Sequence, residues 1–287
     1  MIGIEFRILG PLEVLKEGVL LEVSAPREQA LLAMLILEAN KVVPISRLID
    51  SMWDGFPPQT ARNQVQICVS RLRRGFGSVD DCSLIRTRTP GYQIHVTAQM
   101  VDAIRFEELA ADGRRAADNG ALHDAVTELR AALGLWRGSA AAGISSRVVQ
   151  IAASGLNEKR LATLETCIGL ELRIGNHGEI VGELAPLIAE YPFREQLRAY
   201  QMLALYRAGR RAEALAAYRE ARQAFMDELG LDLGPELRRL EQAIFRNDPS
   251  LNLSGNVPGP RSASMPAAIS FSSVSGPGFH LSQLPAD

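Results

Sequence analysis

Residues 59–77 read QTARNQVQICVSRLRRGFG and have the pattern of an amphipathic helix whose charges are all of one sign. The stretch contains arginines and no carboxylate, although the whole chain has a formal net charge of -2. At about 100° per residue, its apolar side chains fall within one stripe about 100° wide, which we expect to face a core. That stripe consists of Ala61, Val65, Cys68, Val69, Leu72 and Phe76.

The opposite side of this helix is polar and basic, and two interpretations of it stay open. A charge run is usually a solvated face. A solvated helix, however, gains from interleaved acidic and basic pairs, which this stretch lacks. Ile67 also lies among polar neighbours, where an apolar side chain needs a partner such as a thymine methyl group. The side carries Gln59, Asn63, Gln66, Ile67, Ser70 and Arg74, flanked by Thr60, Arg62, Arg71 and Arg73.

The residues before this stretch alternate short strands with short helices. Residues 5–9, 12–15 and 19–23 are strand-like runs separated by turn residues, which predicts a small antiparallel sheet. Helical spacing then begins behind a candidate cap at Ser24 and continues to Asn40.

A second helix is expected to open on Ser46. It ends before residues 54–58, DGFPP, because two consecutive prolines break one helix and permit the next to begin. Residues 59–77 are therefore the third helix of the N-terminal region.

Residues 83–96 read SLIRTRTPGYQIHV, two extended arms around Pro90-Gly91, which predicts a β-hairpin. Pro-Gly fits the central pair of a type II turn, but tight hairpins more often use primed turns, so the turn type stays open. Arg86 and Arg88 alternate onto one face of the first arm, where they would lie beside the basic helix. Cations on an edge strand also serve simply to block aggregation.

From residue 101 to about residue 247 the pattern is almost entirely helical. Gly175 and Gly209 lie 34 residues apart, and each opens a turn before a second helix, as Gly120 does upstream. These spacings are typical of tetratricopeptide repeats, whose helix pairs stack into a solenoid. An ordinary irregular helical domain is the alternative.

Residues that follow the repeat glycines support this interpretation in part. A small residue follows five positions later in the first and third units, at Ala125 and Ala214. The second unit has Ile180 at this place and closes at Pro192, where a tetratricopeptide repeat would place its proline. We expect residues 138–155 to interrupt the array between the first two units.

Composition limits the class of protein. At 287 residues and 47% hydrophobic, the chain can bury one or two sizeable cores. It shows no signal-peptide pattern and no apolar run of the roughly 18 residues that a membrane span needs, so we expect a cytoplasmic protein without membrane contact. The three cysteines are odd in number and far apart, which predicts reduced thiols. Residues 249–287, dominated by Ser, Pro and Gly, are expected to be disordered.

An enzyme finds little support in the sequence. The four histidines are scattered, and neither an HExxH nor a G-x-S-x-G motif occurs. We therefore expect no catalytic residues, no cofactor and no bound metal.

Several of these segments together resemble the Streptomyces antibiotic regulatory protein family over roughly residues 4–248. The N-terminal part is similar to an OmpR-type winged helix in FRILGPLEV, LIDSMWDGFPP, VSRLRR and TPGYQI. The C-terminal part is similar to the bacterial transcriptional activation domain in FEELAADGRRA, ALYRAGRRAEALAAYREAR and DELGLDLGPELRRLEQAI. Larger members add a nucleotide-binding module, whereas no lysine of this chain stands in a G-x-x-x-x-G-K-[ST] loop.

The resemblance implies a fold and a division into domains. Residues 1–100 would form an α+β winged helix-turn-helix domain, and residues 101–248 an all-α tetratricopeptide-like helical repeat domain. Residues 249–287 would remain as the disordered tail.

The resemblance also implies a function, that of a sequence-specific transcriptional activator of secondary-metabolite (antibiotic) biosynthetic genes. Such a protein binds direct repeats in promoter DNA, which favours a homodimer on DNA, and recruits RNA polymerase holoenzyme including its sigma factor. A protein-interaction scaffold with a merely structural winged helix is the alternative. A scaffold would show no DNA affinity that falls steeply with salt.

The missing carboxylates fit a recognition helix, because a helix in the major groove faces phosphates on both sides. Residues spaced four apart on one ridge of the exposed side are expected to contact bases, and residues near the helix ends to hold phosphates. The wing arginines are expected to enter the minor groove or grip its phosphates. The base contacts are Asn63, Ile67 and Arg71, the phosphate contacts Thr60, Arg62 and Arg74, and Gln66, Ser70, Arg86 and Arg88 complete the predicted interface.

Activation is expected to depend on the helical domain and not on the tail. Stacked helix pairs offer an extended face for protein contacts. A fragment ending near Asn247 should bind DNA and activate transcription, whereas one ending near Met100 should bind more weakly and fail to activate.

Overall fold

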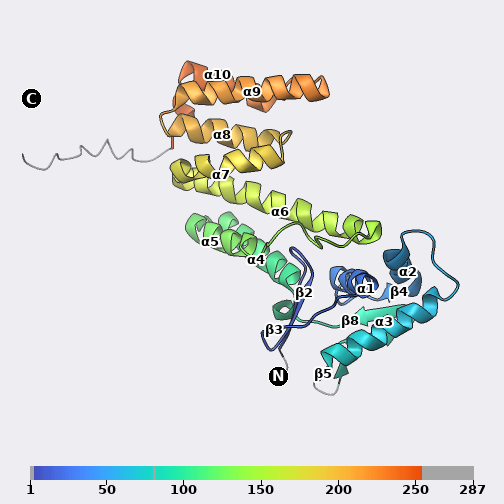
Figure 1. Cartoon of the computed structure of the whole chain (residues 1–287). Coiled ribbons are helices and arrows are strands. Elements are labelled where there is room, and N and C mark those ends of the chain that lie inside the picture. Colours follow the sequence, from blue (N-terminus) through green and yellow to red (C-terminus); the bar gives the residue numbers. More distant parts are fainter. Residues whose placement is uncertain (1–2, 80–81, 254–287) are drawn as a thin grey trace, which may run out of the picture. The chain divides into compact units, whose positions relative to one another are not determined.

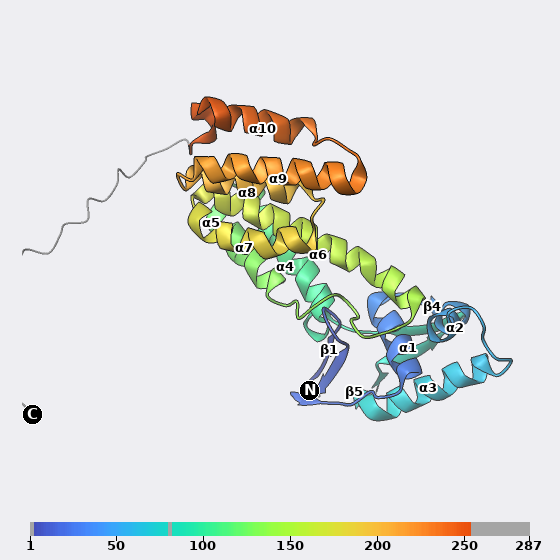
Figure 2. The ribbon, with the colours of Figure 1, turned by 45° about the horizontal axis from the view of Figure 1, so that its top comes forward.

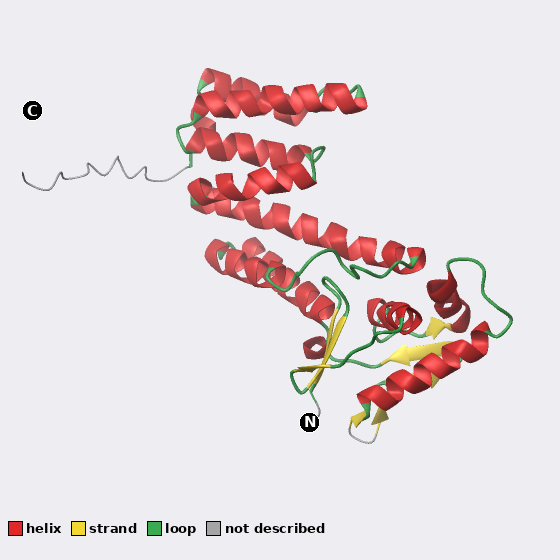
Figure 3. Cartoon of the chain, viewed as in Figure 1, coloured by secondary structure: helices red, strands yellow, loops and turns green. Residues whose placement is uncertain are grey.

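A computed structural model of the chain describes residues 3–79 and 82–253 (Figure 1). Its strands gather in the first hundred residues, and helices follow (Figure 3). Strands β1 (Ile4–Arg7), β2 (Glu13–Lys16) and β3 (Val19–Leu20) pair antiparallel in this order, which confirms the predicted N-terminal sheet. The predicted disorder of the tail lies, from residue 254 on, outside the described residues.

Helices α1 (Pro26–Leu37), α2 (Ile45–Trp53) and α3 (Ala61–Phe76) follow the sheet. The predicted cap at Ser24 is wrong, because Ala25 is the N-cap residue of α1 and no side chain caps this end. Pro26 begins the helix in its place, since its fixed φ suits a first helical turn. The second helix begins one residue earlier than expected, with Pro44 as its N-cap.

The wing is a β-hairpin that joins a short strand from before α2. Strands β4 (Val43–Pro44), β8 (Gly91–Ile94) and β7 (Ile85–Arg88) pair antiparallel in this order. Strands β5 (Ser78–Val79) and β6 (Cys82–Ser83) pair just before it.

The tip of the hairpin differs from the expected Pro-Gly turn. Arg88 pairs with Gly91, so the central residues are Thr89 and Pro90, which are joined by a cis peptide bond. Gly91 instead starts β8, where a Cβ atom would lie 1.8 Å from the carbonyl oxygen of Val43, so only glycine fits.

The remaining described residues form helices that pack as successive pairs. Helix α4 packs on α5, α6 on α7, α8 on α9, and α10 on both α8 and α9. Gly120, Gly175 and Gly209 all have positive φ, as turns between helices favour. The helices are α4 (Asp102–Asp118), α5 (Leu122–Leu133), α6 (Arg147–Ile174), α7 (His177–Glu190), α8 (Glu195–Arg207), α9 (Arg211–Leu229) and α10 (Pro235–Arg246), with the short 3-10 turns η1 (Ala98–Met100) and η2 (Pro249–Leu251).

The expected interruption at residues 138–155 is only half correct. Residues 138–146 are a loop, but residues 147–155 form the first turns of the 28-residue helix α6. Ser146 caps this helix by accepting from the backbone N–H of Val149. The start of the helix was not predicted, because the serines and glycines of this segment are typical of a loop.

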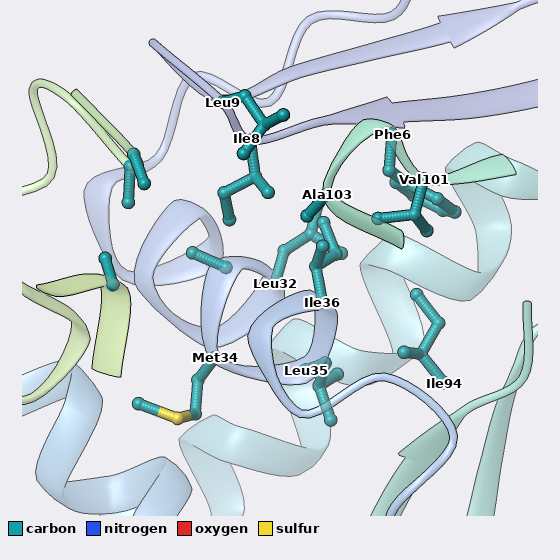
Figure 4. Close-up of a cluster of buried hydrophobic side chains, with 14 of the residues drawn as sticks. Phe6, Ile8, Leu9, Leu32, Met34, Leu35, Ile36, Ile94, Val101 and Ala103 are labelled. Carbon is teal, nitrogen blue, oxygen red and sulfur yellow. The ribbon is translucent and has the colours of Figure 1, made fainter. Parts of the chain in front are cut away.

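One hydrophobic core joins the winged helix to the first helix pairs. Figure 4 shows Phe6, Ile8 and Leu9 in one buried cluster with Val101 and Ala103. Helix α1 is buried all round over residues 30–36, where α2, α3, β8 and α6 pack against it. A helix that is buried on every side needs neighbours on every side, and the helical region supplies some of them.

Buried polar contacts strengthen this junction. Both carboxylate oxygens of Asp102 accept from the backbone N–H of Ile8, at 2.8 and 3.0 Å, and one also accepts from Leu9 at 3.0 Å. The backbone N–H groups of Arg137 and Ala141 donate in turn to the carbonyls of Leu9 and Ile8. Burial raises the pKa of Asp102, and the bonds from Ile8 and Leu9 oppose that rise.

Candidate nucleic-acid interface

Helix α3 has the two faces that its sequence predicts. The described buried residues of the helix are the six of the apolar stripe. The residues of the predicted polar side are exposed, and Ile67 among them exposes 51% of its surface. The base-contacting set and the phosphate-contacting set therefore share one accessible surface: Thr60, Arg62, Asn63, Gln66, Ile67, Ser70, Arg71 and Arg74.

Helix α1 supplies this face with polar partners that periodicity did not reveal. Arg71 donates to the carboxylate of Glu28 at 3.1 Å, so one arginine of the carboxylate-free helix is paired from outside it. Arg27 donates to the amide oxygen of Gln64 at 3.2 Å and lies over the ring of Trp53, 5.0 Å from its centroid. A hollow of about 740 Å³ between α1 and α3 is lined by these polar groups and by Ile67 and Cys68.

Arg73 of α3 forms hydrogen bonds to the hairpin. It donates to the carbonyl oxygen of Ile85 at 2.8 Å and to the hydroxyl of Thr87 at 2.9 Å, and its guanidinium lies 5.8 Å from the centroid of the Tyr92 ring. The side of β7 that faces α3 therefore carries Ile85 and Thr87. The flank position of Arg73 in the sequence did not indicate this role.

The two wing arginines share one face of the hairpin, as expected. Arg86 pairs with Gln93 and Arg88 with Gly91, so both point away from the side that Arg73 holds. Arg86 is half-buried and Arg88 is exposed. The position of Arg86 beside the basic helix stays a prediction. At the tip, Arg88 lines a hollow of about 560 Å³ together with Arg62 and Gln66.

The hollow at the tip brings the recognition helix and the wing together. It is bounded by the first turns of α2 and α3 and by the turn of the hairpin, with Pro90 and Tyr92 in its wall. Two guanidinium groups at one concave surface favour the oxygens of a phosphate backbone. Arg62 and Arg88 both line this hollow, and their contact with the phosphates of a DNA strand stays a prediction.

We expect Arg88→Ala to lower DNA affinity and to reduce the dependence of log affinity on log salt by about one unit, the share of one phosphate contact. Arg86→Ala is the matched control and should change the slope by less, because its side chain does not line the hollow. Titrations at several salt concentrations measure both slopes. If log affinity depends on log salt with the same slope in Arg88→Ala and in the unmodified protein, Arg88 contacts no phosphate. The wing arginines would then serve only to block aggregation at a strand edge.

Among the described residues, no group of three or more His, Cys, Asp and Glu side chains could hold a metal ion. Cys68 and Cys167, the cysteines whose side chains are described, are free and buried, and burial raises the pKa of both thiols. No helix in the described part of the chain is long and apolar enough to cross a membrane.

A trihelical unit with a β-hairpin wing and an exposed basic helix, followed by packed helix pairs, defines a winged-helix transcriptional regulator. Residues 22–94 match the family described as "Transcriptional regulatory protein, C terminal", and residues 101–245 match the "Bacterial transcriptional activator domain". The chain belongs to the Streptomyces antibiotic regulatory protein family of transcriptional activators, as the sequence resemblance implied.

Relatives in this family differ in length. The chain is 39% identical to the regulatory protein AfsR of Streptomyces coelicolor over 87% of its own length but only 25% of AfsR. It is 33% identical to the regulatory protein DnrI of Streptomyces peucetius, covering 88% of itself and 95% of DnrI. The chain thus spans about a quarter of the longer relative and nearly all of the shorter one.

A solved structure has the same fold. Mycobacterium tuberculosis EmbR in complex with a low-affinity phosphopeptide matches with a TM-score of 0.83 and 31% identity, over 87% of this chain and 66% of that chain. This likeness confirms the winged helix followed by a helical domain. The tetratricopeptide-like character of the helix pairs and the domain boundaries at residues 100 and 248 stay predictions.

Proposed function

We propose that this chain binds direct repeats in promoter DNA as two copies side by side and activates secondary-metabolite genes by recruiting RNA polymerase holoenzyme with its sigma factor. The observation that carries the proposal is the exposed, carboxylate-free face of α3 beside the Arg62–Arg88 hollow. Such a surface suits a duplex, because base edges lie between two rows of phosphates. The proposed site of action is the cytoplasm, and the proposed role needs no catalysis.

We infer that the loop between α2 and α3 contributes a contact to polymerase. Phe56, in the loop between α2 and α3, exposes 95% of its surface. An aromatic side chain in water on a binding face suits a contact with protein, because aromatic residues anchor many interfaces. The helix pairs from α4 to α10 add an extended second surface.

Footprinting on the promoters that neighbour the gene tests the proposal, with and without RNA polymerase holoenzyme. We expect two protected segments in the same orientation, spaced by about one helical turn of 10–10.5 base pairs or a multiple of it. Polymerase should then extend the protection towards the start of transcription. Absence of any salt-sensitive protection would favour the scaffold function instead, in which the helix pairs bind protein and the winged helix is structural.

A further inference from the structure

A residue of the winged helix caps the longest helix of the helical region. Asp54 ends α2 with a left-handed backbone, φ 45°, and its side chain reaches the N-terminus of α6. One carboxylate oxygen accepts from the backbone N–H of Arg147 at 3.0 Å. The other accepts from the hydroxyl of Ser146 at 3.3 Å and faces the N–H of Val148 at 3.5 Å. Figure 2 shows the start of α6 beside α2, as Figure 1 does.

Asp54 and Ser146 divide the cap between them. The first N–H groups of a helix have no partner within the helix and need acceptors from outside it. Ser146 accepts from Val149, the third residue of α6, and Asp54 accepts from the two residues before it. A negative charge at this end is also favoured by the helix dipole. The start of α6 is therefore completed only when the loop after α2 is in place.

The same loop is connected to the recognition helix by two routes. Along the chain, it runs from Asp54 to Thr60, the N-cap residue of α3. Through space, the guanidinium of Arg27 lies over the ring of Trp53, the last residue of α2 and the neighbour of Asp54. Arg27 also donates to Gln64 in the first turn of α3. The position of Asp54 is thus linked to the part of α3 that holds the predicted phosphate and base contacts.

We propose that Asp54 is a positioning residue for DNA binding. By capping α6 it anchors the α2–α3 loop to the helical region. This anchor holds the start of α3 in the position in which Arg62 and Gln66 line one hollow with Arg88. The inference rests on the proposed function for its DNA readout, but the mechanical link between α6 and the loop does not depend on it. The helical region thereby contributes to DNA binding without touching DNA.

The test uses the full chain and three substitutions. Asp54→Gly removes the carboxylate while keeping a residue that adopts positive φ freely, so α2 still ends where it does. Asp54→Asn keeps the backbone preference and an acceptor, because Asn and Asp are comparable helix caps. Ser146→Ala is the matched control, since it removes the bonds of the Ser146 hydroxyl to Val149 and Asp54 but leaves the bonds that Asp54 accepts from the backbone of Arg147 and Val148. Affinity for the footprinted promoter, amide hydrogen exchange and thermal unfolding are measured for each.

Asp54→Gly is expected to lower specific DNA affinity about 3- to 30-fold, the ratio to which a lost cap corresponds. Exchange should rise at the amides of Arg147 and Val148 and also across residues 55–62. Asp54→Asn should restore affinity to within about threefold of the unmodified protein, and Ser146→Ala should leave affinity within about twofold while exchange at the start of α6 rises.

Two results would overturn the proposal. The first is amide hydrogen exchange across residues 55–62 in Asp54→Gly that equals that of the unmodified protein, because the loop would then be held in place without the bonds from Asp54 to α6. The second is an equal loss of affinity in Asp54→Gly and Ser146→Ala, because affinity would then follow fraying of α6 and not the position of the loop. If the unmodified protein protects no promoter, the proposed function fails, and the exchange measurement alone decides the positioning role.

Discussion

Cutting the chain after Met100 is expected to abolish specific DNA binding and not merely to weaken it. The winged helix shares its core with the helical region, and α1 has buried residues on every side. The cut removes Val101, Ala103 and Phe106 from this core and uncovers the side of α1 that α6 contacts. It also leaves the backbone groups of Ile8 and Leu9 without their buried partners.

The expected loss is about 1,000-fold or more, the lower end of the ratio between specific and non-specific binding. The matched control is a fragment that ends at Asn252 and retains the described helices. It should bind with the affinity of the full chain and unfold cooperatively. Titration of both fragments with a promoter duplex, beside their thermal unfolding, makes the comparison. A fragment of residues 1–100 that folds cooperatively and retains specific affinity would show that the shared core is dispensable for the winged helix.

Asp102→Ala is expected to lower the free energy of unfolding by about 2 to 5 kcal/mol. The substitution leaves two buried backbone N–H groups, of Ile8 and Leu9, without an acceptor. It also removes the carboxylate that lies 3.7 Å from the guanidinium of Arg137. Domains of this kind are stable by only about 5 to 15 kcal/mol, so the loss is a large fraction of the total.

Asp124→Ala is the control for this prediction. Asp124 also stands in the first turn of a helix, α5, but it is exposed. Its removal should cost no more than about 1 kcal/mol, the usual range for an acid beside an exposed helix terminus. Urea denaturation of the three proteins measures the differences. A loss below about 1 kcal/mol for Asp102→Ala would mean that water replaces the carboxylate and that the junction is less dry than its burial indicates.

Local features of the chain were predictable from the sequence. The apolar stripe of α3 follows from the helical period alone, and all six of its residues are buried. The glycines at positions 120, 175 and 209 adopt positive φ because a turn after a helix favours it. These features depend on residues within a few positions of one another, which a sequence displays directly.

Contacts between distant residues were not predictable in the same way. Arg71 and Glu28 are 43 residues apart, and no period joins them. The spacing of apolar residues predicted that α1 is a helix, but it did not predict the neighbouring elements that bury this helix on every side. The cap of α6 by Asp54 spans more than ninety residues, so the serines at the start of this helix read as part of a loop. The pair of Arg71 and Glu28 depends on the packing of α3 against α1 within the winged helix. The cap of α6 and the contact between α1 and α6 depend on the packing of the winged helix against the helical region.

The most direct test of the central claim, that the exposed face of α3 reads DNA, compares Asn63→Ala with Arg74→Ala. Both residues are exposed on α3, but Asn63 is expected to contact a base and Arg74 a phosphate. The measurement is the affinity of each protein for the footprinted promoter and for a set of its single base-pair variants, at several salt concentrations.

Asn63→Ala should cost about 1 to 3 kcal/mol and relax the preference at one base pair, whereas Arg74→Ala should weaken all sequences equally and reduce the salt slope by about one unit. Arg114→Ala, which removes an exposed arginine from α4, should change neither quantity. Equal losses on every sequence for Asn63→Ala, or affinities that do not respond to Asn63→Ala and Arg74→Ala at all, would contradict the assignment of α3 as the recognition helix.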